Sequence, residues 1–356
     1  MKEVVGMKII TCASYYGSGS SALTDLVAEY ENVKDLTNYE FRFLYDIDGV
    51  SDLEYHLVEN HDRHNAGHAL KRFQRLCDFN AGNFMSKRCS AFMSKDEYQR
   101  IISRYIDSLT DFKYKGWWFY DLYDKGIKTY YLYQIFNHIF AKIPFTGLKI
   151  LKNEYTLCSH PGEEQFLEQT RRLVSEFLAA LNKENMDFLE IDQIAPSANT
   201  ERILRYFKDE CYVFIVDRDP RDVYLMEKYV WRERVCPNDV ELFCKWFAYA
   251  REAGSGVPKD HPHIIKIRYE DLIYRYDESV NRIERKVGLT PRMHKAQFTK
   301  MNPRRSVVNT RLWERYSKEI DNIKIIEKRL KKYLYQYDDI PKSALKGIDV
   351  QDRKLF

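Results

Sequence analysis

The cysteines of this 356-residue chain form none of the patterns that bind metals or build disulfide frameworks. There are seven of them, an odd number, and they are scattered along the sequence without a CxxC pair. Closely paired cysteines are typical of zinc sites, and an even, regularly spaced set is typical of secreted disulfide scaffolds. We therefore expect reduced thiols in a reducing compartment and no zinc site.

Long apolar runs are also missing. The sequence contains no stretch of about 20 apolar residues, the length that a membrane-spanning helix requires. The N-terminus shows no apolar segment of signal-peptide length behind a basic start. These absences favour a cytoplasmic protein without a membrane span.

An excess of one charge is absent too. Lys and Arg number 57 against 53 Asp and Glu, so the net charge is +4, which is too small to favour general nucleic-acid binding. A local basic pocket for a phosphorylated ligand stays open. The 44% hydrophobic and 31% charged residues are those of an ordinary globular protein. The 15% aromatic residues fit either large buried contacts or surfaces that stack on sugars and bases.

Four continuous apolar runs predict strands. They cover residues 8–14, 188–192, 212–217 and 263–268, and helix-like segments follow them. Continuous apolar strands that alternate with helices are typical of a parallel sheet covered on both faces. The sequence therefore predicts an α/β protein.

The stretch from about 90 to 150 differs from the rest of the chain. It is aromatic and helical in character, with GWWFYDLYDKG at 116–126 and no strand-like run, so we expect a helical insertion there. A charged amphipathic helix is expected at 318–335. The expected organisation is a single domain over residues 1–340 that carries this insertion, followed by a C-terminal tail at 341–356.

A loop rich in glycine and serine, YYGSGSS at 15–21, follows the first strand and precedes a helix. Unpaired N–H groups at a helix N-terminus bind anions, glycines let the backbone approach the anion closely, and serines add donors. A Walker A loop has Lys after its second glycine, whereas Ser20 follows Gly19 here. This difference disfavours an ordinary ATP or GTP hydrolase. Taken alone, the loop fits a phosphate cradle and a flexible connection equally well.

A second unusual turn, RDPRD at 218–222, follows the clearest strand of the sequence. Pro220 suits the first turn of a helix, Asp219 can cap that helix, and Asp222 suits its positive end. Arg218 would then lie at the carboxyl end of a strand, where open α/β sheets bind ligands, and its guanidinium can bind a phosphate through two bonds. An ion pair of Arg218 with Asp219 or Asp222 in a structural network is equally compatible with the sequence.

Together, these two strand–turn–helix units resemble the nucleotide-binding elements of the sulfotransferases that use PAPS (3′-phosphoadenosine-5′-phosphosulfate), in particular the bacterial and carbohydrate-acting members. IRYEDLI at 267–273 is similar to the family's Tyr-Glu-Asp-Leu signature, and NPRRSVVNTRLW at 302–313 is similar to the late loop that closes over the nucleotide. Segments 46–57 and 63–73 resemble bacterial relatives, where this region lies near the acceptor. The likeness spans roughly residues 7–315.

The resemblance implies a P-loop-like parallel sheet flanked by helices. It also implies transfer of a sulfuryl group from PAPS, by in-line displacement, to a hydroxyl or amine of a saccharide or small-molecule acceptor, with PAP as product and no metal required. By family likeness, the loop would hold the 5′-phosphosulfate, Arg218 the 3′-phosphate, and the late loop would cover the nucleotide. The residues expected to bind PAPS are Gly17, Ser18, Gly19, Ser20, Ser21, Arg218, Arg304, Arg305 and Ser306.

The same resemblance bears on location and partners. Eukaryotic carbohydrate sulfotransferases usually carry a membrane anchor, and none is apparent in this sequence. We therefore expect a bacterial cytoplasmic enzyme with no nucleic-acid partner, while the oligomeric state is left open.

Three departures from the family pattern concern the chemistry. Many members have Lys or Arg where Gly17 stands, and Lys71 or Arg72 are the candidates to replace that cation. Many members have Ser where Met226 stands. No His occupies the end of the strand at 188–192, where cytosolic members have their catalytic base.

The catalytic base is therefore sought among other groups. Asp192, at the end of a strand, is the first candidate, because burial raises the pKa of a carboxyl group toward that of a useful base; its alternative is a capping or ion-pairing role. His64 is next, together with His61 and His68, in a polar run that could equally be a solvated helix face. The adjacent acids of the YEDL segment are interpreted as capping groups rather than as a glycosidase pair.

Two alternative functions stay open. One is a non-catalytic nucleotide- or sugar-binding protein on the same fold, which the missing loop cation and the lack of a clear base favour. The other is a small-molecule kinase, which the missing P-loop Lys disfavours.

Overall fold

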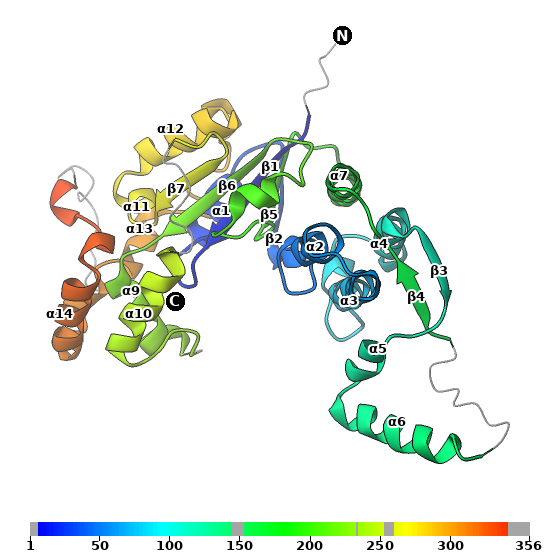
Figure 1. The fold of residues 1–356 in the computed structure, drawn as a ribbon. Helices are drawn as coiled ribbons and strands as arrows, with labels where there is room; N and C mark the ends of the chain where they lie inside the picture. Colours follow the sequence, from blue (N-terminus) through cyan, green and yellow to red (C-terminus); the bar gives the residue numbers. More distant parts are fainter. Residues whose placement is uncertain (1–5, 144–152, 233, 253–259, 341–356) are drawn as a thin grey trace, which may run out of the picture. The chain divides into compact units, whose positions relative to one another are not determined.

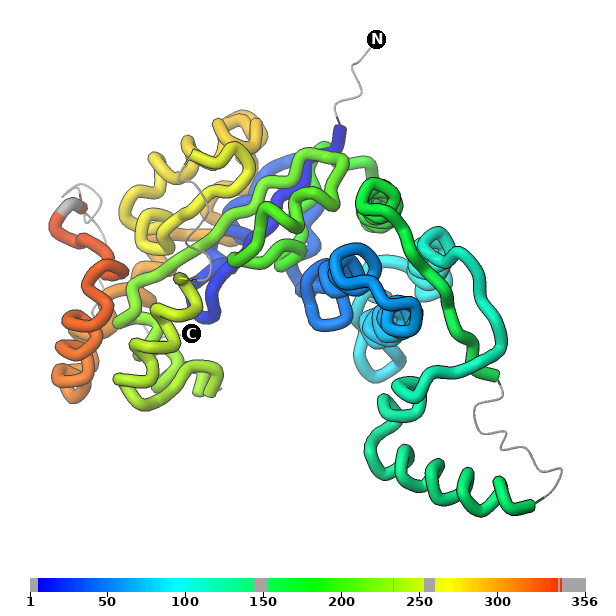
Figure 2. The backbone as a smooth tube through the Cα atoms, in the orientation of Figure 1, coloured from blue at the N-terminus to red at the C-terminus, as the bar shows by residue number. Residues whose placement is uncertain are grey.

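The computed structural model of the chain describes residues 6–143, 153–232, 234–252 and 260–340, and Figures 1 and 2 show its backbone. The chain forms two compact units. Unit 1 consists of Met1–Phe41 and Asn182–Phe356, and unit 2 consists of Arg42–Leu181. Unit 2 is therefore inserted in the sequence of unit 1.

Unit 1 is built on a parallel sheet of five strands in the order β2-β5-β1-β6-β7 (Figure 1). All four strands that the apolar runs predict are present, and the prediction of a parallel α/β sheet flanked by helices is confirmed. The strands are β1 (Lys8–Ser14), β2 (Val33–Glu40), β5 (Phe188–Asp192), β6 (Cys211–Asp217) and β7 (Ile264–Arg268).

β1 lies in the centre of the sheet, between β5 and β6, and is almost completely buried. Ile9, Ile10 and Ala13 are at most 1% exposed. Because successive side chains of a strand point to opposite faces, a strand that is covered on both faces needs an unbroken apolar run. This requirement explains why the unbroken apolar run at 8–14 was enough to predict β1.

Helices cover this sheet and pack against each other beside it. On one face, α1 and α12 join the sheet in a core that includes Leu26 and Ile283. A second core contains Phe247 of α10 and Ile326 of α14. The helices of unit 1 are α1 (Ser21–Val27), α8 (Thr200–Leu204), α9 (Pro220–Met226), α10 (Val240–Glu252), α11 (Asp271–Tyr274), α12 (Tyr276–Val287), α13 (Pro303–Ser306) and α14 (Ile320–Arg329).

Two elements of unit 1 differ from expectation. β2 was not predicted, because this strand at the edge of the sheet buries only Leu36 and reads VKDLTNYE, without an apolar run. The helix expected at 318–335 is shorter than predicted. It is α14, which ends at Arg329, and short 3₁₀ turns flank it.

Unit 2 is mainly helical, with one antiparallel pair of short strands. The insertion expected at about 90–150 falls inside unit 2, which begins earlier, ends later and includes a strand, β3, where no strand was expected. Residues 144–150 of that insertion, and the expected tail at 341–356, lie outside the described residues. The elements are α2 (Val50–Glu54), a π-helical turn (Tyr55–Glu59), α3 (Arg63–Ala81), α4 (Lys95–Leu109), β3 (Phe112–Lys115), α5 (Phe119–Tyr123), α6 (Ile127–Phe140), β4 (Tyr155–Cys158) and α7 (Glu163–Leu181).

In the part of the chain that the structure describes, no helix combines the length and the apolar character that a membrane span would need.

Candidate functional site

A cavity of about 440 Å³ opens in unit 1, among residues that follow the carboxyl ends of three strands. Gly19 comes after β1, Arg218 follows β6 directly, and Tyr269 follows β7 directly. Ligands of open α/β sheets bind at this edge. Five of the residues expected to bind PAPS line the cavity together, although they come from distant parts of the sequence: Gly19, Ser21, Arg218, Arg305 and Ser306.

The loop between β1 and α1 needs glycine at two positions. Gly17 and Gly19 have φ angles of +73° and +79°, which side chains rarely adopt. A Cβ atom on Gly17 would lie 2.8 Å from the ring of Trp231, and one on Gly19 would lie 2.5 Å from the ring of Tyr269. The loop is therefore held between two aromatic rings that sequence reasoning did not select, and Tyr269 and Trp231 also line the cavity.

The serines of the loop differ in their surroundings. Ser18 is 1% exposed, and its hydroxyl has no hydrogen-bond partner within the described ranges. Ser20 stands at the N-cap of α1 without a capping side-chain bond, and Ser21 begins the helix and lines the cavity. The hydroxyl of Ser18 therefore has unused hydrogen-bonding capacity inside the loop.

Arg218 joins the glycine loop to the late loop. Its side chain is almost fully buried at 2% exposure. One guanidinium nitrogen donates to the Gly17 carbonyl at 3.4 Å and another to the Asn309 carbonyl, while the ring of Tyr269 lies 4.7 Å from the guanidinium carbon. The Nε atom has no partner among the residues that the structure describes. Part of this buried cation is thus unsatisfied, and it lines a cavity.

The two aspartates of the RDPRD turn have other partners than Arg218. Asp219 caps α9 by accepting from the Arg221 N–H, and it also binds the Arg221 guanidinium at 2.8 Å. Asp222 accepts from the N–H groups of Arg311 and Leu312 at 3.1 and 2.8 Å. Burial raises the pKa of Asp222 to about 8, although nearby Arg218 lowers it. These aspartates hold the turn and the late loop in place.

The YEDL segment follows β7 and starts α11, but Glu270 at the N-cap of α11 makes no side-chain capping bond and binds neighbouring segments instead. Glu270 is completely buried and accepts from the Asp219 N–H at 2.7 Å. Arg268 donates to the other oxygen of Glu270 at 3.3 Å. Tyr269 donates from its hydroxyl to the Ser306 carbonyl at 3.2 Å. This segment therefore connects the ends of β6 and β7 to the late loop.

The late loop contributes only part of what was expected of it. Arg305 and Ser306, in the short helix α13, line the cavity, whereas Arg304 is not among the lining residues. Asn302 caps α13 by accepting from the Arg304 N–H at 3.0 Å. Trp313 packs under the Arg221 guanidinium, whose carbon lies 3.7 Å from the ring centre, and does not line the cavity.

Lys300 is a cation of the cavity that sequence reasoning missed. Its ammonium group lies 2.8 Å from the Asp35 carboxylate, and the residue lines the cavity together with Asp25. The only sequence signal was its place just before the NPRR segment. Lys71 and Arg72, the expected replacements for the loop cation, belong to unit 2, where they pair with Asp121 and Asp48.

Asp192 ends β5 as expected and has the electrostatics of a base, but it does not line the cavity. Burial, followed by the nearby charge of Glu40, raises its pKa to about 7. Its Oδ1 atom has no hydrogen-bond partner in the described part of the chain. Glu190, two residues earlier on the same face of the strand, is 1% exposed, and burial raises the pKa of its carboxyl group well above the usual range.

The second candidate base, His64, lies in α3 of unit 2. Its ring stacks on Trp118 with centroids 4.3 Å apart, and the Arg63 Nε atom donates to it at 3.1 Å. The role of His64 as a base stays a prediction.

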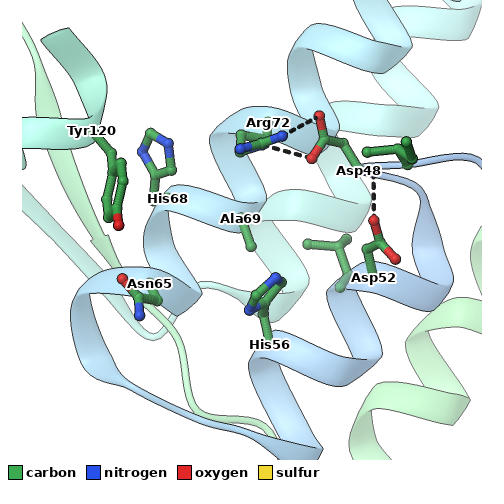
Figure 3. A pocket seen from close by; sticks show the side chains of 10 residues that line it. Asp48, Asp52, His56, Asn65, His68, Ala69, Arg72 and Tyr120 are labelled. Carbon is green, nitrogen blue, oxygen red and sulfur yellow. Dashed lines mark hydrogen bonds and ion pairs between the residues drawn. The ribbon is translucent and has the colours of Figure 1, made fainter. Parts of the chain in front are cut away.

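Unit 2 contains a cavity of its own, of about 330 Å³. Figure 3 shows side chains from α2, the π-helical turn, α3 and α5 pointing toward one space. Most of them belong to segments 46–57 and 63–73. Its polar and aromatic lining residues are Asp48, Asp52, His56, Asn65, His68, Arg72 and Tyr120.

Ion pairs fix the wall of this second cavity. Arg72 binds Asp48 through two bonds of 2.6 and 3.1 Å (Figure 3). His68 lies between two carboxylates, with Nδ1 3.3 Å from Asp121 and Nε2 2.8 Å from Asp124. Burial raises the pKa of Asp121, but bonds from His68, the Trp118 N–H and Lys71 outweigh it and hold this pKa at about 2. The Asp121 carboxyl group, which lies beside this wall, is therefore ionised at neutral pH.

Within the described ranges, no group of His, Cys, Asp and Glu side chains is arranged to hold a metal ion.

Comparisons with known proteins place few constraints on this chain. No protein-family model matches it, and no curated protein matches it by sequence. Among solved structures, it is similar to the sulfotransferase STF1 from Mycobacterium tuberculosis H37Rv. That similarity has 12% sequence identity and a TM-score of 0.34, over 83% of this chain and 72% of the other.

Proposed function

We propose that this protein is a PAPS-dependent sulfotransferase whose nucleotide site is the cavity of unit 1. One observation carries the proposal: three motifs chosen separately from the sequence line the same cavity. The glycine and serine loop contributes Gly19 and Ser21, the RDPRD turn contributes Arg218, and the late loop contributes Arg305 and Ser306. The resemblance of these motifs to PAPS-binding elements suggests PAPS as the ligand. Their meeting at one cavity supports that suggestion.

Each group has a proposed role. The loop at 17–21 holds the 5′-phosphosulfate through its N–H groups and serine hydroxyls. Arg218, whose Nε atom is unsatisfied, binds the 3′-phosphate. Arg305 and Ser306 cover the nucleotide. Lys300 takes the part of the missing loop cation and stabilises charge on the oxygen between phosphorus and sulfur as it leaves.

The proposed reaction is an in-line displacement at sulfur. The acceptor oxygen or nitrogen forms a new bond to sulfur while the bond between sulfur and the 5′-phosphate oxygen breaks, which leaves PAP. The proton of the acceptor passes to a base. Asp192 is the first choice, because its pKa of about 7 suits a base at neutral pH. His64 is the second.

The acceptor is proposed to be carbohydrate-like, and the cavity of unit 2 is the candidate site for it. Asp48, Asn65 and Arg72 offer acceptors and donors for hydroxyl groups, and Tyr120 offers a ring face for stacking. The compartment is proposed to be the bacterial cytoplasm.

Calorimetric titration of PAP tests the nucleotide site. We expect PAP to bind the wild type and Arg218→Ala to lose affinity by about 10- to 100-fold, since a charge-assisted pair contributes about 1.5 to 3 kcal/mol. Arg285→Ala is the matched control, because Arg285 lies on α12 and its side chain donates to the Asn281 carbonyl of its own helix. A folded wild type that does not bind PAP would overturn the proposal.

The same titration separates the alternatives. Preference for ATP with magnesium over PAP would favour a small-molecule kinase. PAP binding without transfer to any acceptor in a saccharide and small-molecule panel would favour a non-catalytic binding protein.

A further inference from the structure

Helix α6 exposes an unusual amount of apolar side chain. Six of its residues, and Ile143 just after it, are large, hydrophobic and between 43% and 61% exposed. Soluble proteins rarely leave a contiguous surface of this kind without a partner. The exposed residues are Ile127, Tyr131, Leu132, Ile135, Phe136, Ile139 and Ile143.

The helix has one packed side and one side that is largely exposed. Tyr133 is buried against Leu122 of α5, with Tyr130 beside it, and its ring meets Trp117 at 5.2 Å. Figures 1 and 2 show α6 beside α5, extending away from the body of unit 2. At about 100° per residue, the exposed apolar residues fall within one half of the helix circumference, and Tyr130 and Tyr133 fall in the other half. The apolar face therefore points away from the unit.

The charge of this segment has a single sign. Residues 125–143 contain three lysines and no Asp or Glu. Lys125 pairs with Glu154. Lys128 and Lys142 are exposed and project from the same half of the helix as the apolar residues, one in its first turn and one just beyond its last. A broad apolar face with aromatic residues and terminal lysines matches a membrane surface with anionic headgroups, because the apolar side chains enter the acyl boundary while lysines reach the phosphates.

We propose that α6 docks this protein on anionic membranes, lying in the plane of the interface. A helix of 14 residues is about 21 Å long, too short to cross the roughly 30 Å hydrocarbon core. A second copy of α6 fits less well as the partner, because it would bring lysines against lysines with no acidic side chain to pair with them. This inference does not depend on the proposed enzymatic function.

Vesicle co-sedimentation of the full chain tests the proposal. The probes are vesicles of phosphatidylcholine alone and of phosphatidylcholine with about a third of phosphatidylglycerol. We expect at least about tenfold stronger binding to the anionic vesicles, with a loss at high salt. Phe136→Glu should lower that binding by about tenfold or more, and Lys128→Glu combined with Lys142→Glu should remove the preference for anionic lipid.

Phe84→Glu is the matched control, since Phe84 is 94% exposed in the same unit but outside α6; it should bind as the wild type does. Circular dichroism and PAP titration of each variant separate loss of docking from loss of fold or of the nucleotide site. Absence of binding to anionic vesicles by the folded wild type would overturn the proposal. So would sedimentation showing a dimer that Phe136→Glu dissociates, with no vesicle binding, because α6 would then cover a second copy.

Discussion

Asp192 at the end of β5 is the register partner of Glu40 at the end of β2. Two carboxyl groups thus stand side by side at one edge of the sheet, and Asp192 is largely buried there. Burial and the charge of Glu40 together raise the pKa of Asp192 to about 7 from an ordinary value of 3.8. Because the pKa of Asp192 differs between the folded and the unfolded chain, the free energy of unfolding should depend on pH through this residue.

The first prediction is that Asp192→Asn makes the protein more stable at pH 8. Between pH 4 and 7 the folded wild type holds a proton at Asp192 that the unfolded chain releases. The wild type therefore loses stability as pH rises through this window, and the variant does not. We expect an advantage of about 2 kcal/mol at pH 8 that disappears near pH 4, measured by urea unfolding across pH. An advantage that does not change with pH would contradict the assignment.

Gly19→Ala is predicted to lower PAP affinity by about tenfold or more and stability by about 2 kcal/mol. The new methyl group would clash with Tyr269, and the backbone would be strained at a φ of +79°. Gly126→Ala is the matched control, because Gly126 has a φ of +99° with nothing within 4 Å of the added Cβ. The control should lose stability by about 1 kcal/mol and keep PAP affinity. Equal effects of the two variants on PAP binding would argue against a cradle at Gly19.

Asp222→Ala should destabilise the protein by about 2 to 3 kcal/mol, since it leaves the N–H groups of Arg311 and Leu312 without their acceptor. Hydrogen exchange should accelerate at these two amides. Asp321→Ala, at a side chain that is 92% exposed, should change stability by less than about 0.5 kcal/mol. If exchange at Arg311 and Leu312 stays slow in Asp222→Ala, the late loop is held by other contacts.

Lys300→Gln is predicted to weaken PAP binding by about tenfold, because it removes a charge-assisted bond to the nucleotide. Lys300→Arg should retain most of the affinity. Lys324→Gln, on the exposed side of α14, provides the matched control. Unchanged affinity in Lys300→Gln would mean that another cation replaces the missing loop residue.

The strands were predictable where burial on both faces leaves an unbroken apolar run, as in β1 and β6. β2 escaped detection because only Leu36 is buried in this edge strand. The short pair β3 and β4 escaped for the same reason, since every residue of β3 is exposed. Apolar patterns in a sequence arise from side chains that are buried in the fold. A strand with few buried side chains therefore has no apolar pattern by which it could be predicted.

The site was predictable where a local rule acts. Glycine favours positive φ angles, and proline favours the first turn of a helix such as α9, so both residue types could be interpreted from the sequence alone. Trp231 and Lys300 had no such signal, because their part in the cavity depends on packing between segments far apart in the sequence. Lys71 and Arg72 form ion pairs with Asp121 and Asp48 in unit 2, and their part as the missing loop cation stays a prediction.

The strand order of unit 1 also limits when the glycine loop at 17–21 can take its shape during synthesis. In β1, Lys8 pairs with Phe188 and Ile9 with Cys211, while β2 pairs only with β5. A ribosome therefore completes all of unit 2 before it makes any strand that the first 41 residues can join. The loop at 17–21 is therefore synthesised well before β5 and β6, and a fragment that ends before β5 lacks both strands that pair with β1.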